Sequence, residues 1–185
     1  DRIFLNGNMN IPTKESLAPE RANRFLIYPQ SILEKAGINL ASALQMEIMR
    51  EVLRDFKNVY VLFEDVIPVF KKLKERMLKI GIITNADQRA VDLVEKLGLT
   101  SYLDVIVTSE QVGVEKPATP IFQAALNQVK TRAEESIYVG DQYDTDILGA
   151  INAGMKPVLI DRYNIETNTC DCIKINTLTE VLQHI

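Results

Sequence analysis

The stretch IYVGDQYDTDILGA, residues 137–150, decides the fold of this chain. A short apolar run with the character of a β-strand ends at Gly140, and a helical pattern resumes at Ile147. The residues between them include three carboxylates: Asp141, Asp144 and Asp146. Ligands of open α/β sheets bind beyond the carboxyl ends of the strands. The stretch therefore predicts an acidic loop at the ligand-binding edge of a sheet.

This acidic loop has two interpretations. Clustered carboxylates repel one another unless a cation lies among them, and hard oxygen ligands suit Mg²⁺, which shares its remaining positions with water and substrate phosphate. Alternatively, Asp144 or Thr145 caps the helix that follows, and the acidic residues favour the positive end of its dipole. The loop by itself leaves both interpretations open.

Composition narrows the class of protein. The chain has 185 residues, enough for one core with a small appendage. Its 46% hydrophobic and 25% charged residues are typical of a globular protein. The net charge of -4 offers no basic face for nucleic acid, and no apolar run reaches membrane-spanning length. We therefore expect a soluble protein with neither nucleic acid nor membrane as a partner.

The cysteines and the first residue lead to two further expectations. Cys170 and Cys172 are one residue apart, poor geometry for pairing with each other, and they are too few ligands for zinc. We expect these cysteines to have no role, and we expect the protein to be cytoplasmic, in a reducing compartment. The chain begins at Asp1 rather than at Met, so we expect that part of the protein upstream is missing.

The order of patterns predicts the domain organisation. Residues 12–58 are mostly helical in pattern without a strand signal, whereas strands and helices alternate over residues 59–185. Such alternation is typical of a Rossmann-like α/β core, a parallel sheet with helices on both faces. We interpret 1–11 as the first strand and turn of that core, 12–58 as a small helical cap, and 59–185 as the core itself.

Single elements of the core can be expected from periodicity and from cap residues. Thr119 is expected to be the N-cap of a helix that has Pro120 at its first position. The expected strands are 79–84, 104–108, 136–139, 157–161 and 174–175, and the expected helices are 66–77, 88–97, 119–129, one from 147, and 178–182.

Three predicted strand ends carry groups that suit one phosphate. Thr84 and Asn85 offer a hydroxyl and backbone N–H groups at the start of a helix, which together suit an anion. Lys116 offers a point charge for phosphate oxygens, and Asp141 offers a cation site. Alone, Thr84 is equally well a helix cap and Lys116 a solvated lysine. Their order along the chain, each after a strand, favours a shared phosphate site.

These motifs resemble those of the haloacid dehalogenase-like superfamily, most of whose members are Mg²⁺-dependent phosphatases. IGIITN at 80–85 is similar to the second motif of the family, and Lys116 with the following proline is similar to the third. VGD at 139–141, continued to Asp146, is similar to the fourth, as is the ILGA and NAGM tail after it. The resemblance covers about residues 59–161.

The resemblance implies a mechanism and roles for site residues. An Asp at the end of the first strand attacks phosphorus to give an aspartyl-phosphate, and a second Asp two residues later acts as general acid and base. Thr84 would bind the phosphoryl group together with Asn85. Lys116 would neutralise charge, held by Asp146. Asp141 would ligate Mg²⁺, and Asp146 would be a second ligand. The only histidine, His184, has no part.

The first motif departs from the pattern of the family. The best match, IFLNGNMN at residues 3–10, has Asn6 and Asn8 where the two aspartates belong, and a carboxamide is a poor nucleophile. Either the true first strand lies upstream, which we favour, or the site is degenerate. The first explanation predicts a phosphatase acting on a small phosphorylated metabolite, as a monomer or homodimer. The second predicts a phosphate-binding or regulatory module without turnover.

Overall fold

The structure, a computed structural model, describes residues 2–6, 60–164 and 172–185. The chain divides into two compact units: Asp1–Asn10 with Val61–Ile185, and Ile11–Tyr60. The helical cap that the sequence predicts at 12–58 lies outside the described residues and stays a prediction.

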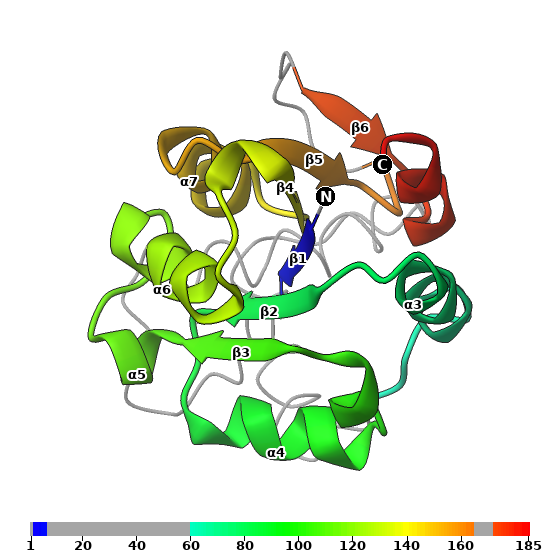
Figure 1. The fold of residues 1–185 in the computed structure, drawn as a ribbon, viewed down its shortest axis with the longest axis horizontal. Helices are drawn as coiled ribbons and strands as arrows, with labels where there is room; N and C mark the ends of the chain where they lie inside the picture. The colour runs from blue at the N-terminus through cyan, green and yellow to red at the C-terminus, as the bar shows by residue number, and fades with distance from the viewer. Residues whose placement is uncertain (1, 7–59, 165–171) are drawn as a thin grey trace, which may run out of the picture. The chain divides into compact units, whose positions relative to one another are not determined.

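The first unit is built on a parallel sheet with strand order β3-β2-β1-β4-β5-β6 (Figure 1). This architecture confirms the predicted Rossmann-like α/β core. The strands are β1 Arg2–Asn6, β2 Ile80–Thr84, β3 Val105–Thr108, β4 Ser136–Gly140, β5 Lys156–Ile160 and β6 Ile173–Ile175.

The first strand, β1, lies in the middle of the sheet, between β2 and β4 (Figure 1). Its register pairs Leu5 with Val139 of β4 and Asn6 with Ile83 of β2. In the described sheet, residues Arg2–Asn6 thus hold the position between β2 and β4. The expectation that the true first strand lies upstream of this chain stays a prediction. The strand ends at Asn6, and Asn8 lies outside the described residues.

Helices pack on both faces of the sheet because its inner strands are apolar on both sides. Ile80 and Ile82 of β2 join one core with α3, α4 and the C-terminal helix η4, whereas Ile83 joins the other core with α6 and α7. Successive strand residues point to opposite faces, which explains this division. The helices are α3 Val66–Glu75, α4 Gln88–Lys96, α5 Ser109–Val112, α6 Thr119–Val129, α7 Leu148–Asn152, and the short η1 Thr100–Tyr102, η2 Ala133–Glu135, η3 Tyr143–Ile147 and η4 Leu178–Gln183.

Local structure differs from the sequence expectations at two helix starts. The residues after Thr108, where the sequence predicts no helix, form the four-residue helix α5, whose capping box joins Thr108 and Gln111. A helix this short has no periodicity by which to predict it. The N-cap of α6 is Ala118 rather than Thr119, and a proline lies in its first turn as expected.

The acidic stretch is also more regular than expected. Residues Tyr143–Ile147 form the π-helical turn η3, in which the amides of Asp146 and Ile147 both donate to the Gln142 carbonyl, at 2.8 and 3.3 Å. The helical conformation therefore begins at Tyr143, four residues before the helix start that the sequence predicts at Ile147. Short π-helical turns are frequent at functional sites.

The expectation for the cysteines is wrong for Cys172, which is disulfide-bonded. Cys170, the only other cysteine of the sequence, lies outside the described residues. In the described part of the chain, no helix is both long and apolar enough to span a lipid bilayer.

A partly buried ion pair fixes the start of α3 where the chain enters the core. Arg162, after β5, donates from Nη1 and Nη2 to the two carboxylate oxygens of Asp65, at 2.8 and 2.9 Å. The backbone amide of Leu178 donates to Asp65 Oδ2 at 2.7 Å. Burial acts to raise the pKa of Asp65, but the Arg162 and Leu178 hydrogen bonds and the Arg162 charge outweigh it and lower that pKa.

We predict that Asp65→Asn lowers the free energy of unfolding by about 1 to 2 kcal/mol at pH 7. A lowered pKa in the folded state stabilises the protein above the unfolded-state value, near 3.8, and this contribution is lost as the pH falls through the folded-state value. Below pH 4 the wild type should therefore lose stability more steeply than the variant. Urea denaturation between pH 2.5 and 7 measures this, with Glu64→Gln, at an exposed neighbouring carboxylate, as the control. Equal pH dependence of wild type and Asp65→Asn would contradict the prediction.

Candidate active site

The candidate site lies at the edge of the sheet where neighbouring parallel strands end. β2 ends at Thr84, β1 ends at Asn6, and β4 ends at Gly140, directly before Asp141. Because β2, β1 and β4 are adjacent, these strand ends are adjacent too. Lys116 comes from the segment between α5 and α6 and reaches the same edge. The structure thus brings together the strand ends that the sequence predicts for one phosphate.

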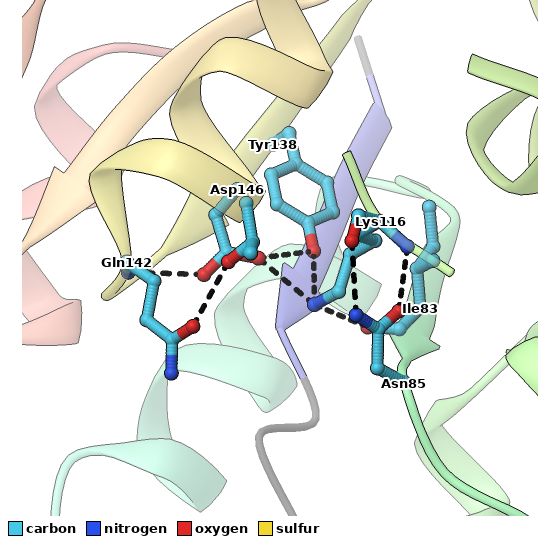
Figure 2. A network of polar contacts seen from close by, with 7 residues as sticks. Ile83, Asn85, Lys116, Tyr138, Gln142 and Asp146 are labelled. Carbon is cyan, nitrogen blue, oxygen red and sulfur yellow. Dashed lines mark hydrogen bonds and ion pairs between the residues drawn. The ribbon is translucent and has the colours of Figure 1, made fainter. Parts of the chain in front are cut away.

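Lys116 is buried, with 5% of its surface exposed, and three acceptors surround its ammonium group (Figure 2). Nζ lies 2.8 Å from Asp146 Oδ1, 3.1 Å from the Tyr138 hydroxyl and 3.3 Å from the Ile83 carbonyl. An ammonium has three N–H donors, so these acceptors can engage all of them. Ile83 is the register partner of Asn6, so the positive charge lies near the end of β1.

Asp146 is fully buried on η3 and forms an ion pair with Lys116. Its Oδ1 also accepts from the Tyr138 hydroxyl at 3.2 Å, and its Oδ2 accepts from the Gln142 amide at 3.0 Å. The close approach requires Gly140, because a Cβ there would lie 2.3 Å from Asp146 Cβ. This geometry directs Asp146 toward Lys116, and its predicted role as a Mg²⁺ ligand stays a prediction.

Asn85 holds the backbone of Lys116 through its side chain. Asn85 Oδ1 accepts from the Lys116 amide at 2.7 Å, and Asn85 Nδ2 donates to the Lys116 carbonyl at 3.1 Å (Figure 2). Lys116 therefore contacts Ile83 and Asn85, the residues on either side of Thr84. Thr84 itself is buried, with 1% exposed. The sequence predicts backbone donors at this turn but not this side-chain clamp.

Asp141 is the exposed carboxylate at the end of β4, in contrast to buried Asp146. Among the residues that the structure describes, no group of three or more His, Cys, Asp or Glu side chains is placed to hold a metal ion. A single carboxylate nevertheless fits Mg²⁺, which commonly keeps several waters and takes phosphate oxygens beside one or two carboxylates. The donor set thus fits Mg²⁺ through Asp141.

Tyr138 is a polar member of the site that sequence reasoning missed. It lies on β4, two residues before Gly140, and is fully buried. Burial raises the pKa of Tyr138 well above its usual range, and the charge and hydrogen bond of Asp146 raise it further, so the hydroxyl stays protonated. One sequence signal could have indicated Tyr138. It is a tyrosine on an apolar strand, and it lies on the same face as Gly140 at the strand end.

We predict that Asn85→Asp weakens the link between β2 and the Lys116 segment. The new carboxylate still accepts from the Lys116 amide, but it places an oxygen against the Lys116 carbonyl where Nδ2 donates at 3.1 Å. The free energy of unfolding should fall by about 1 to 3 kcal/mol, because a buried acceptor loses its donor. Urea denaturation measures the loss, and Asn127→Asp, the same change on the exposed side of α6, is the control. Equal losses in the two variants would contradict the clamp.

Comparisons with known proteins identify the family. The model of the haloacid dehalogenase-like hydrolases matches residues 13–160. The glyceraldehyde 3-phosphate phosphatase of Methanothermobacter thermautotrophicus is 33% identical over 117 residues, 59% of this chain and 52% of that protein. The ribulose-1,5-bisphosphate 5-phosphatase of Halopiger xanaduensis is 39% identical over 101 residues, 54% of this chain and 42% of that protein.

The structural comparison agrees at the level of the fold. The crystal structure of a HAD phosphatase from Thermococcus onnurineus superposes with a TM-score of 0.69 and 22% identity, covering 99% of this chain and 96% of that one.

The chain spans about half the length of the curated relatives that it matches. Since the family model covers most of the chain, and the motifs at Thr84, Lys116 and Asp141 follow its order, the chain belongs to the haloacid dehalogenase-like hydrolases.

Proposed function

We propose that this chain is a phosphohydrolase that acts on a small phosphorylated metabolite. The observation that carries the proposal is the placement of Lys116, a buried cation held at the end of β2 and near the end of β1. The ion pair with Asp146 offsets part of the cost of burying this charge, and its position at the strand ends lets the charge attract a phosphoryl group there. The phosphatase names of the curated relatives support the same reaction class.

Each site residue has a distinct part in this proposal. Lys116 supplies positive charge beside the phosphoryl group and neutralises negative charge that develops on its oxygens. Thr84, with the backbone amide of Asn85, binds the same group at the start of α4. Asp146 holds Lys116 in place through their 2.8 Å contact. Asp141 holds Mg²⁺, which when bound supplies positive charge at the phosphoryl group.

A second candidate function rests on a specific observation, the end of β1 at Asn6. The family mechanism needs a carboxylate at this strand end to form an aspartyl-phosphate. A carboxamide there is neutral and cannot attack phosphorus in this way. The second candidate is therefore a module that binds phosphate or a phosphorylated metabolite through Thr84 and Lys116 but does not turn it over.

Two measurements test the phosphate site and separate these functions. Inorganic phosphate binding, followed by calorimetry, should weaken about tenfold or more in Thr84→Val, because a hydrogen bond to a charged ligand is lost. The control is Thr108→Val, the register partner on β3, whose hydroxyl caps α5, so its loss should affect stability rather than binding. Replacing Lys116 is a poor test, because the unpaired Asp146 carboxylate would cost roughly 3 to 5 kcal/mol of stability.

Hydrolysis of p-nitrophenyl phosphate with Mg²⁺ decides between the candidates. A phosphohydrolase should show turnover in the wild type and lose it in Asp141→Ala. The binding module should show turnover only after Asn6→Asp restores a carboxylate. Since Asn6 precedes Gly7, mass spectrometry of the wild-type peptide must first exclude deamidation of Asn6 to Asp. Absence of both phosphate binding and turnover in wild type and Asn6→Asp would refute both candidates.

A further inference from the structure

We propose that Tyr138 is a positioning residue of the phosphate site, whose hydroxyl holds the Lys116 ammonium and the Asp146 carboxylate in their relative geometry. This inference deepens the proposed function and rests on it for the role of Lys116. The hydroxyl lies 3.1 Å from Lys116 Nζ and 3.2 Å from Asp146 Oδ1, so it contacts both members of the ion pair (Figure 2).

The direction of the two hydrogen bonds gives the hydroxyl a specific task. Lys116 has no acceptor, so its ammonium donates to the Tyr138 oxygen, and the Tyr138 O–H donates to Asp146 Oδ1. Asp146 Oδ1 therefore accepts from both Lys116 and Tyr138. A hydroxyl in this position limits rotation of the carboxylate and of the ammonium, which a single ion-pair contact does not do.

The ring of Tyr138 is itself held in a fixed orientation. Its centroid lies 5.0 Å from that of Phe122 on α6, with the rings at 69°, an edge-to-face contact. Phe122 in turn packs against Gly149 of α7, where a Cβ would lie 2.6 Å from Phe122 Cζ. Phe122 and Tyr138 are both fully buried. The packing of α6 and α7 thus aims the hydroxyl at the ion pair.

The alternative is that Tyr138 only fills the core between β4 and α6. In that case the ring would matter and the hydroxyl would not. Tyr138→Phe separates the two, because it keeps the ring and removes only the oxygen. Tyr102→Phe is the matched control, since Tyr102 is a partly buried tyrosine in edge-to-face contact with Phe70, 6.0 Å between centroids, in the other core.

The first readout is calorimetric binding of inorganic phosphate to the full chain. Tyr138→Phe should bind phosphate about tenfold more weakly than the wild type, because a hydrogen bond to a charged group is worth about that factor. Tyr102→Phe should bind like the wild type. Wild-type affinity in Tyr138→Phe would overturn the inference.

The second readout does not depend on phosphate. The Gln142 amide donates to Asp146 Oδ2 at 3.0 Å, so its hydrogen exchange reports how well the Asp146 carboxylate is held. Exchange at Gln142 should accelerate in Tyr138→Phe, while amides of α6 exchange at wild-type rates. Unchanged exchange at Gln142 would overturn the inference. If the wild type binds no phosphate, the proposed function fails. The exchange measurement then still tests whether the Tyr138 hydroxyl holds the Asp146 carboxylate.

A second variant keeps the inference testable if Tyr138→Phe does not fold. Phe122→Leu retains the Tyr138 hydroxyl but removes the aromatic edge that orients its ring. It should accelerate Gln142 exchange as well, and to a smaller extent than loss of the hydroxyl itself. Wild-type exchange at Gln142 in a folded Phe122→Leu protein would show that the ring orientation does not control the ion pair.

Discussion

The buried ion pair between Lys116 and Asp146 is the interaction on which the rest of the site depends. Both side chains are almost fully removed from water, which costs free energy that a single Coulombic contact does not return. The Tyr138 hydroxyl, the Ile83 carbonyl and the Gln142 amide supply the further hydrogen bonds. The pair thereby links β2, β4, η3 and the segment before α6 at one edge of the sheet.

The ion pair between Lys116 and Asp146 also sets the electrostatic environment at the end of β1. Lys116 and Asp146 together carry no net charge, and Asn6 adds none, so the exposed negative charges after β4 are those of Asp141 and Asp144. A carboxylate in place of Asn6 would add a negative charge near Lys116, which already forms an ion pair with Asp146. The two candidate functions therefore differ in whether the whole protein supplies a nucleophilic carboxylate at this edge of the sheet. The fold of the first unit is the same for both.

The sequence predicted those strands and helices that are long enough to show a hydrophobic periodicity. Apolar runs predicted β2 and β4 as strands covered on both faces, and successive residues such as Ile82 and Ile83 do lie in different cores. Helix α5 and the π-helical turn η3 were not predictable, because each is one turn long. The contacts of Tyr138 and of the Asn85 side chain join segments far apart in sequence, which periodicity does not reveal.

The central position of β1 has a consequence for how the chain folds. Its partners are Ile80 to Ile83 on one side and Ser136 to Val139 on the other, so both pairings close long loops. The first of these loops contains a compact unit of its own, Ile11–Tyr60. Contacts between distant residues slow folding, because the entropy of loop closure is lost before they form. The middle of the sheet, and with it the site at the end of β1, should therefore assemble after the local βα units on either side.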